Sequence, residues 1–197
     1  MYRVGNDIII ENDQIIKVSC QDEGLREACA LAILDHPNII KFKKAEAELI
    51  DGLEKIVITE KEYVPLSKMP IPIANILREQ ILDEMIEALA YLESQDVMQH
   101  DLKSENIVWD MSEKKFLLID FGIATFTPQT ERNDYTAETR PPELFDPRLT
   151  PEFNSRLDLF ALGVSLILLR TGKFGKIIDF KGIEGIDPKF IYNKEYI

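Results

Sequence analysis

The middle of this chain carries the pattern that most restricts its fold. Residues 99–106 read QHDLKSEN and lead directly into an apolar stretch, and a DFG tripeptide follows at 120–122. A second apolar stretch, residues 116–119, stands directly before that tripeptide. An Asp close to a Lys is commonly only a solvent-exposed pair, and a DFG alone is weak. The five-residue spacing from Asp101 to Asn106, with a strand-bounded DFG behind it, is far more specific.

Hydropathy patterns divide the chain into a β-rich first 60 residues and a helix-rich remainder. β-branched runs around a turn predict a hairpin, apolar residues at helical spacing predict helices, and three prolines in residues 65–72 predict a segment that joins two lobes. The expected elements are a hairpin at 8–18, a helix at 22–34, two or three strands within 39–63, a helix at 73–95, strands at 106–109 and 116–119, and a helix at 156–171. Residues 123–150 lack periodicity, and loops of that length are usually functional or mobile.

At residues 99–108 and at the DFG that follows, the sequence resembles the eukaryotic-type protein kinases, whose catalytic loop reads H-R-D-L-K-x-x-N. The resemblance implies phosphoryl transfer from ATP with Mg²⁺. It makes Asp101 the base for the attacking hydroxyl and Lys103 the cation beside the transferred phosphoryl group. It makes Asn106 and Asp120 the Mg²⁺ ligands. A Lys two positions after the base is the choice of the Ser/Thr-type members.

Further segments resemble this family in its own order, over roughly residues 8–175. The IIK that ends at Lys17 is similar to the third-strand V-A-I-K, which places Lys17 on the nucleotide phosphates and makes Glu27 its ion-pair partner. Residues 139–144 (TRPPEL) resemble the A-P-E segment. Residues 156–163 (RLDLFALG) resemble the D-x-W-S-x-G helix start, which makes Asp158 a brace for the catalytic loop. In isolation, Asp158 reads as a first-turn Asp favoured by the helix dipole.

The resemblance also implies a nucleotide site. The Ala that lies over adenine in the family is here Ile15, which narrows the site. The hinge aligns in two ways: residues 58–60 (ITE) put Thr59 at the gatekeeper position, and residues 61–65 (KEYVP) put Lys61 there. We favour the first, because a Thr suits the back of an apolar pocket better than an ammonium group. The expected nucleotide-binding residues are Ile15, Lys17, Glu27, Thr59, Glu60, Glu62, Asn106 and Asp120.

Several features depart from the family pattern. No G-x-G-x-x-G occurs, and residues 1–10 are too few for both a first strand and a phosphate-covering loop, so we expect weaker nucleotide binding. Only ten residues separate Lys17 from Glu27. Residues 99–100 (QH) replace the family's His-Arg, so a buried amide needs partners, and a mostly neutral His predicts little dependence on loop phosphorylation. The family's last helices have no visible counterpart after Lys173.

Composition narrows the alternatives. Asp and Glu number 35 against 23 Lys and Arg, a net charge of −12, which disfavours binding to a nucleic-acid backbone. No apolar run is long enough to span a membrane, and no charged-then-apolar leader opens the chain. Cys20 and Cys29 are too few for a disulfide framework, so we expect a cytoplasmic protein with free thiols.

We therefore expect an α+β, protein-kinase-like bilobal fold with a reduced β-rich N-lobe and a mainly helical, shortened C-lobe. One truncated kinase domain would fill residues 1–197, with the N-lobe at 1–64 and the C-lobe at 65–197. The expected activity is transfer of phosphoryl groups from ATP, with Mg²⁺, to Ser/Thr hydroxyls of protein substrates. The main alternative is a pseudokinase, a binding module that regulates another kinase or its substrate through an exposed surface of either lobe. A small-molecule kinase of the aminoglycoside-phosphotransferase type is a third.

Overall fold

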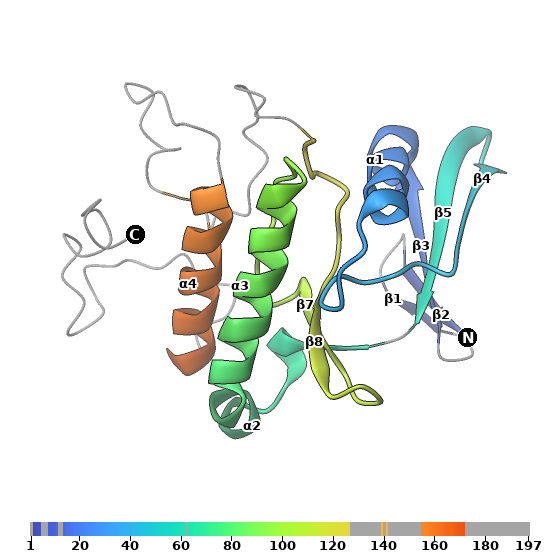
Figure 1. The fold of residues 1–197 in the computed structure, drawn as a ribbon. Helices are drawn as coiled ribbons and strands as arrows, with labels where there is room; N and C mark the ends of the chain where they lie inside the picture. The colour runs from blue at the N-terminus through green and yellow to red at the C-terminus, as the bar shows by residue number, and fades with distance from the viewer. Residues whose placement is uncertain are drawn as a thin grey trace.

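The chain folds into two lobes that lie side by side, one a β-sheet with a helix packed on it and the other a group of helices with a smaller sheet (Figure 1). The computed structural model describes residues 2–4, 8–11, 14–61, 63–126, 139, 141 and 155–171. The architecture is the expected bilobal α+β fold, with a small β-rich first lobe. Among the described residues, no helix has both the length and the apolar character needed to cross a bilayer.

The first lobe is built on a five-stranded antiparallel sheet with the strand order β1-β2-β3-β5-β4. Runs of Ile and Val supply its strands, because β-branched side chains pack well on a pleated surface. A two-residue turn joins β4 to β5 and holds Asp51 and Gly52 at positive φ, 52° and 77°, as the favoured hairpin turn requires. The strands are β1 (Tyr2–Val4), β2 (Ile8–Glu11), β3 (Gln14–Cys20), β4 (Lys44–Ile50) and β5 (Leu53–Lys61).

Helix α1 (Gln21–Ile33) begins directly after β3 and packs against β5. A glycine permits this close approach, since a Cβ on Gly24 would stand 2.4 Å from the Cβ of Ile56. Ala30 and Leu31 on the same helix are buried in the core. No loop separates β3 from α1, so side chains on the two elements can meet over a short stretch of chain.

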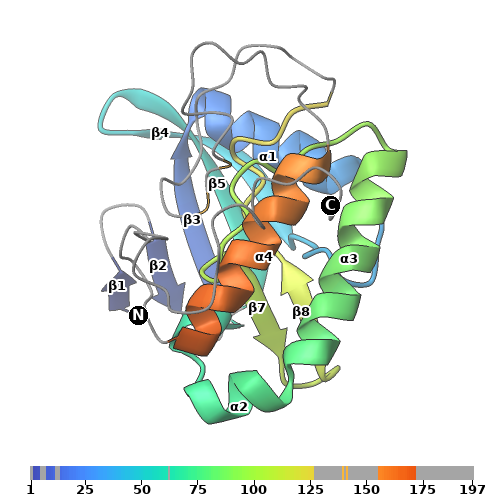
Figure 2. The same ribbon diagram turned by 90° about the vertical axis from the view of Figure 1, so that its left-hand side faces the viewer.

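In the described part of the second lobe, three α-helices and a 3₁₀-helix combine with a three-stranded sheet. Helices α3 and α4 lie side by side, with α2 at one end of the pair (Figures 1 and 2). The core between helices and sheet contains fully buried Ile81, Met85, Phe116 and Leu118. The elements are β6 (Val64–Pro65), the 3₁₀-helix η1 (Leu66–Lys68), α2 (Ile71–Ile76), α3 (Arg78–Ser94), β7 (Ile107–Asp110), β8 (Lys115–Leu118) and α4 (Ser155–Thr171).

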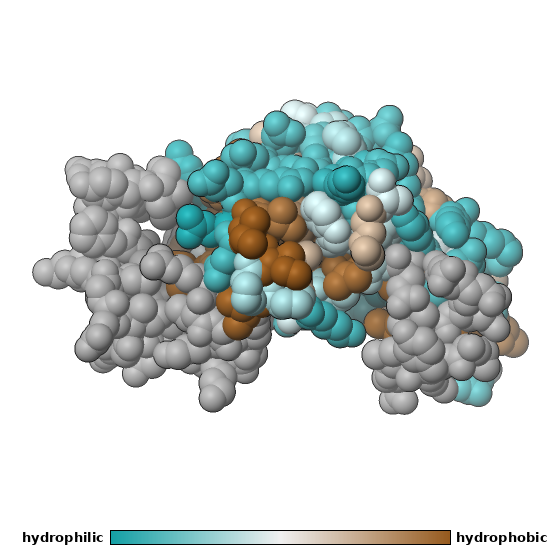
Figure 3. All heavy atoms as spheres, turned by 90° about the horizontal axis from the view of Figure 1, so that it is seen from below, coloured by the Kyte–Doolittle hydropathy of each residue, from teal (hydrophilic) through white to brown (hydrophobic). Residues whose placement is uncertain are grey.

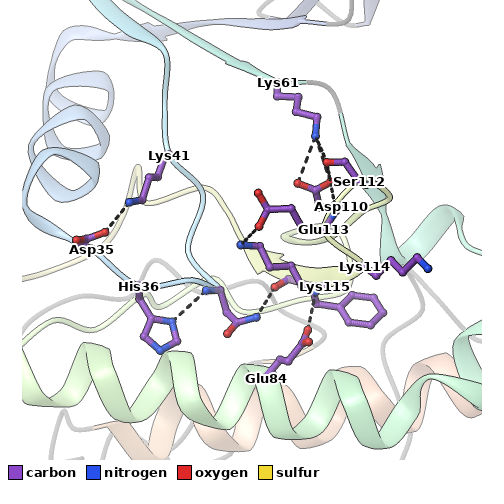
Figure 4. A network of polar contacts seen from close by, with 12 residues as sticks. Asp35, His36, Lys41, Lys61, Glu84, Asp110, Ser112, Glu113, Lys114 and Lys115 are labelled. Carbon is purple, nitrogen blue, oxygen red and sulfur yellow. Dashed lines mark hydrogen bonds and ion pairs between the residues drawn. The ribbon is translucent and has the colours of Figure 1, made fainter.

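Polar contacts join the lobes in several places, and Figure 4 shows two of these regions. After α1, the side-chain amide of Asn38 donates to the carbonyl of Phe116 (2.9 Å), and the N–H of Leu118 donates to the carbonyl of Asn38 (2.8 Å). At the end of β5, Nζ of Lys61 lies 3.1 Å from Oδ1 of Asp110. Burial alone would raise the pKa of Asp110, but hydrogen bonds from Ser112 and Lys61 lower it to about 2.

The helix expected at 73–95 is in fact two helices, α2 and α3, which change direction at Leu77. The helical hydrogen bonds continue through the bend, from the N–H of Leu77 to the carbonyl of Ile73 (3.1 Å) and from the N–H of Ile81 to that of Leu77 (2.9 Å). The apolar stripe therefore runs on without a break, which is why its periodicity predicts one helix.

One other expectation also needs correction. The segment 65–72 is not only a linker, because Pro65 pairs with Val108 in the second sheet and η1 follows it. Residues 1–10 include a first strand, β1, which pairs with β2; this is compatible with the expectation that these residues are too few for both a first strand and a phosphate-covering loop. The predicted loop at 123–150 lies mostly outside the described residues, as do residues 172–197.

Exposed apolar side chains gather on the underside of the second lobe. Ile71, Ile73 and Ile76 of α2 are exposed, Ile76 to 80%. Figure 3 shows apolar surface on this side of the molecule. Isolated exposed apolar residues are ordinary, whereas groups of them are typical of contact surfaces.

Candidate active site

Lys17 stands where the two lobes meet. Its Nζ lies 2.8 Å from Oε2 of Glu27 on α1 and 2.6 Å from Oδ1 of Asp120, just beyond β8. The predicted Lys17–Glu27 ion pair is therefore confirmed. It forms across only ten residues because β3 ends at Cys20 and α1 begins at Gln21.

The surroundings of Lys17 keep its amine charged. Burial alone would lower its pKa, but the carboxylates of Asp120 and Glu27 raise it above the usual Lys value. Glu27 is 1% exposed, and burial raises its pKa against the opposing effects of Lys17 and of a hydrogen bond from the backbone of Phe121. A positive charge is thereby held at a defined place, as recognition of a phosphate group requires.

The DFG segment is anchored to both lobes. Asp120 has a φ of 63°, a conformation that is rare outside glycine and clusters at functional sites. Phe121 is fully buried in the core. The carbonyl of Gly122 accepts a hydrogen bond from Nη1 of Arg26 on α1 (2.9 Å), a contact that the sequence did not predict because it joins segments far apart in the chain.

The loop that carries Asp101 orients its carboxylate with hydrogen bonds from two neighbouring side chains. Oδ2 of Asp101 accepts hydrogen bonds from Nζ of Lys103 (2.6 Å) and Nδ2 of Asn106 (2.9 Å). Nδ2 of Asn106 also donates to the carbonyl of Asp101 (2.9 Å). The N–H of Asn106 donates to the carbonyl of Lys103 (3.0 Å). The spacing of the three residues thus brings their polar groups to one point.

The β7–β8 hairpin joins this loop to Asp120. Ile107 pairs with Leu118 across the hairpin, and the N–H of Ile119 donates to the carbonyl of Asn106 (2.9 Å). Asn106 immediately precedes β7, and Asp120 follows β8 by two residues. Asn106 and Asp120 therefore lie at the same end of the hairpin.

Gln99 is fully buried and connects the loop that carries Asp101 to the DFG segment. Its Nε2 donates to the carbonyl of Asp120 (2.9 Å), and its Oε1 accepts a hydrogen bond from the N–H of Asp101 (2.8 Å). The prediction that a buried amide here needs partners is confirmed. The same two contacts link the backbone of Asp101 to that of Asp120 through one side chain.

Asp158, in the first turn of α4, supports the loop from another side. Its two carboxylate oxygens accept hydrogen bonds from the N–H groups of Gln99 (2.8 Å) and His100 (2.9 Å). Burial raises its pKa to about 6, against the lowering effect of those hydrogen bonds. The brace predicted for Asp158 is therefore confirmed.

His100 connects the loop to the segment after the DFG. Its φ is 66°, and its ring Nε2 lies 2.8 Å from Oγ1 of Thr125, with both residues buried. Met98 and Thr125 exchange two backbone hydrogen bonds of 2.9 Å. The sequence assigned no role to Thr125 in this position, because nothing local marks its partner.

The register of β3 with β5 shows which residues of β5 lie on the same face of the sheet as Lys17. In the antiparallel pair of β3 with β5, Ile15 lies opposite Glu60 and Lys17 lies opposite Ile58. Opposed residues share a face and successive residues alternate. Glu60 therefore lies on the face of Lys17, and Thr59 lies on the other face. The register thus places Glu60, and not the predicted Thr59, on the face of Lys17; the gatekeeper role of Thr59 stays a prediction.

The second hinge alignment puts Lys61 at the gatekeeper position. Nζ of Lys61 is directed to Asp110 on β7 rather than to Lys17. Glu62 lies outside the described residues. The sequence did contain a signal for Glu60, since the buried alternation I-x-I-x-E along β5 ends at this residue.

Oxygen donors suited to Mg²⁺ lie at the end of the β7–β8 hairpin. Asn106 and Asp120 offer an amide and a carboxylate oxygen, the ligand type that Mg²⁺ prefers. Nδ2 of Asn106 is engaged by Asp101, which leaves its amide oxygen for a cation. Within the described ranges, no group of three or more His, Cys, Asp and Glu side chains could hold a metal. Mg²⁺ is commonly bound by one or two carboxylates together with substrate phosphates, so the donors fit an ion that arrives with a nucleotide.

Comparisons with known proteins agree with this arrangement. The family model "Protein kinase domain" matches residues 9–178. The chain is 28% identical over 170 residues to the Aurora kinase of Saccharomyces cerevisiae, covering 83% of this chain and 45% of that protein. It is 30% identical over 164 residues to the serine/threonine-protein kinase US3 homolog of Equine herpesvirus 1, covering 77% and 40%. It is 32% identical over 162 residues to the serine/threonine-protein kinase pkn3 of Myxococcus xanthus, covering 75% and 29%. The chain thus spans less than half the length of these curated relatives.

Proposed function

The chain belongs to the protein kinase family, and on that premise we propose that it transfers the γ-phosphoryl group of ATP to Ser or Thr hydroxyls of protein substrates. The observation that carries the proposal is the joining of two centres at one end of the β7–β8 hairpin. One centre holds the oriented carboxylate of Asp101, and the other holds the ammonium of Lys17. A proton acceptor and a phosphate-binding cation are the parts that phosphoryl transfer asks of a protein.

In the proposed reaction, the substrate hydroxyl oxygen forms a bond to the γ-phosphorus. The bond from that phosphorus to the β,γ-bridging oxygen breaks, and ADP leaves with the electron pair. Asp101 accepts the hydroxyl proton. Lys103 and Asn106 already hold Oδ2 of Asp101. No free energy is therefore needed to orient the carboxylate during the reaction. Lys103 also places a positive charge where negative charge develops on the transferred group.

Lys17 holds the phosphates of the nucleotide in this proposal, and Glu27 keeps its amine in place. Asn106 and Asp120 would hold Mg²⁺. A bound Mg²⁺ ion supplies charge neutralisation on the phosphate oxygens. The protein substrate is favoured to be basic or neutral, because a chain with a net charge of −12 repels acidic partners.

Transfer of radiolabelled γ-phosphate to a basic protein, in the presence of Mg²⁺, tests the proposal. We expect Asp101→Asn to lower the transfer rate by about 100- to 10 000-fold, the usual contribution of a general base. Asp83→Asn is the matched control, because Asp83 is exposed on α3, and it should retain the wild-type rate. Equal rates for wild type and Asp101→Asn would contradict the proposal.

A regulatory binding module is the second candidate. The observation that favours it is the lack of a G-x-G-x-x-G in the 197 residues, since the backbone of that motif covers the nucleotide phosphates in protein kinases. The exposed apolar group on α2, formed by Ile71, Ile73 and Ile76, is then the described surface best suited to a protein partner. A wild-type chain that transfers no more label than Asp101→Asn would favour this candidate.

A further inference from the structure

Glu60 is a buried carboxyl group that the proposed reaction does not use. It is 6% exposed, and none of the described residues donates a hydrogen bond to its Oε1. A buried polar atom without a partner is costly. Proteins tolerate such local violations mainly at functional sites.

The position of Glu60 relates it to the phosphate-binding centre. It lies on β5 opposite Ile15, two residues along β3 from Lys17 and on the same face of the sheet. Two residues of a strand span about 7 Å. If Lys17 contacts the phosphates, a nucleotide that extends along this face brings its base toward Glu60.

We propose that the side-chain carboxyl of Glu60 hydrogen-bonds the polar edge of the nucleobase and thereby helps to select the nucleotide. The inference rests on the proposed function, since it requires a nucleotide bound with its phosphates at Lys17. Strand geometry, burial and the unpartnered oxygen carry it.

The chemistry of the group suits this role. Burial raises the pKa of Glu60 to about 8, with a further contribution from Glu27 and an opposing one from Lys17. Near neutral pH the carboxyl therefore holds a proton and offers one donor and one acceptor. The edge of adenine offers the complementary pair, an amino donor beside a ring-nitrogen acceptor. A phosphate group offers acceptors alone, so it can pair with the O–H donor of this carboxyl but not with its carbonyl acceptor.

Calorimetric titration of the full chain with ATP and with inorganic tripolyphosphate, each with Mg²⁺, separates base from phosphate recognition. Glu60→Leu, which removes the carboxyl at similar volume, should weaken ATP binding about tenfold and leave tripolyphosphate binding unchanged. Glu60→Gln keeps a donor and an acceptor and should stay within about threefold of wild type. Glu48→Leu, the same change at an exposed position of β4, should bind both ligands like wild type.

Two further measurements help to separate recognition of the base from recognition of the phosphates. Glu60→Leu should raise the unfolding midpoint of the unliganded chain, because it removes an unpartnered buried oxygen. Wild type should bind ATP about tenfold more tightly than purine riboside 5′-triphosphate, which lacks the 6-amino group. That comparison needs no variant, so equal affinities would overturn the inference even if Glu60→Leu does not fold.

Four outcomes would overturn the inference. An equal loss for ATP and tripolyphosphate would show that Glu60 acts through Lys17. Unchanged ATP affinity in Glu60→Leu, or equal wild-type affinity for ATP and purine riboside 5′-triphosphate, would overturn the inference while leaving the proposed function intact. A wild-type chain that binds no nucleotide would overturn both, and it is recognised before any variant is made.

Discussion

Replacing Gly24 by Ala tests whether the close approach of α1 to β5 positions the ion pair at the active site. The new Cβ would stand 2.4 Å from the Cβ of Ile56, whereas ordinary contact begins at 3.4 Å. The difference, 3.4 − 2.4, requires a shift of about 1 Å. The atom that it meets is attached directly to the strand backbone and cannot rotate away. The helix itself therefore has to move.

Glu27 lies three residues after Gly24, on the next turn of the same helix, so the displacement also reaches the 2.8 Å contact with Lys17. Overpacking of this kind costs about 1–3 kcal/mol. Ala in place of Gly within a helix returns about 1 kcal/mol. We therefore expect a net loss of at most about 2 kcal/mol in the free energy of unfolding, together with weaker nucleotide binding.

Gly163→Ala is the matched control. Gly163 lies in α4, is exposed, and a Cβ there would meet no atom within 4 Å. This variant receives only the gain in helix propensity, so the difference between the two variants isolates the overpacking. That difference of about 1–3 kcal/mol corresponds to roughly 2–12 °C in the midpoint of thermal unfolding. Equal midpoints for the two variants, with equal ATP affinity, would refute the reasoning.

Two other predictions follow from buried polar contacts. Asp110→Asn should destabilise the chain most above pH 4. The folded state depresses the pKa of Asp110 to about 2. The carboxylate therefore stabilises the fold above the pKa that it has in the unfolded chain, and this stabilisation is lost as the pH falls toward 2. Urea denaturation of both proteins between pH 7 and pH 3 measures this, and a gap that does not narrow with acid would contradict it. Thr125→Val removes the hydroxyl 2.8 Å from Nε2 of His100 and should lower both the free energy of unfolding, by about 1–2 kcal/mol, and the transfer rate. Thr125→Ser should restore both, and a Ser variant as impaired as the Val variant would show that the hydroxyl is not the cause.

The sequence predicted most elements because their signals are local. Alternation in β5 and helical spacing in α3 come from side-chain periodicity within one segment. The same reasoning joined α2 and α3 into one helix, since the apolar stripe and the hydrogen bonds both pass through Leu77. A change of axis direction at constant periodicity leaves no trace in a hydropathy pattern.

In the candidate site, too, contacts within one segment were predictable and contacts between segments were not. The polar groups of Asp101, Lys103 and Asn106 meet because one short loop carries all three, so their spacing was informative. The sequence left the hinge residues open, because the hinge alignment shifts by two residues without any local conflict. The register of β3 with β5 decided that Glu60 lies on the face of Lys17.

By itself, the sequence determined the fold family and the loop that carries the proposed base, because both depend on residue types at fixed local spacing. Only the tertiary structure decided which distant groups meet. It placed Glu27 beside Lys17 through the tight entry into α1, gave the buried Gln99 its partners, and connected His100 to Thr125. These contacts depend on the packing of separate elements to within about an ångström, and no single segment encodes that distance.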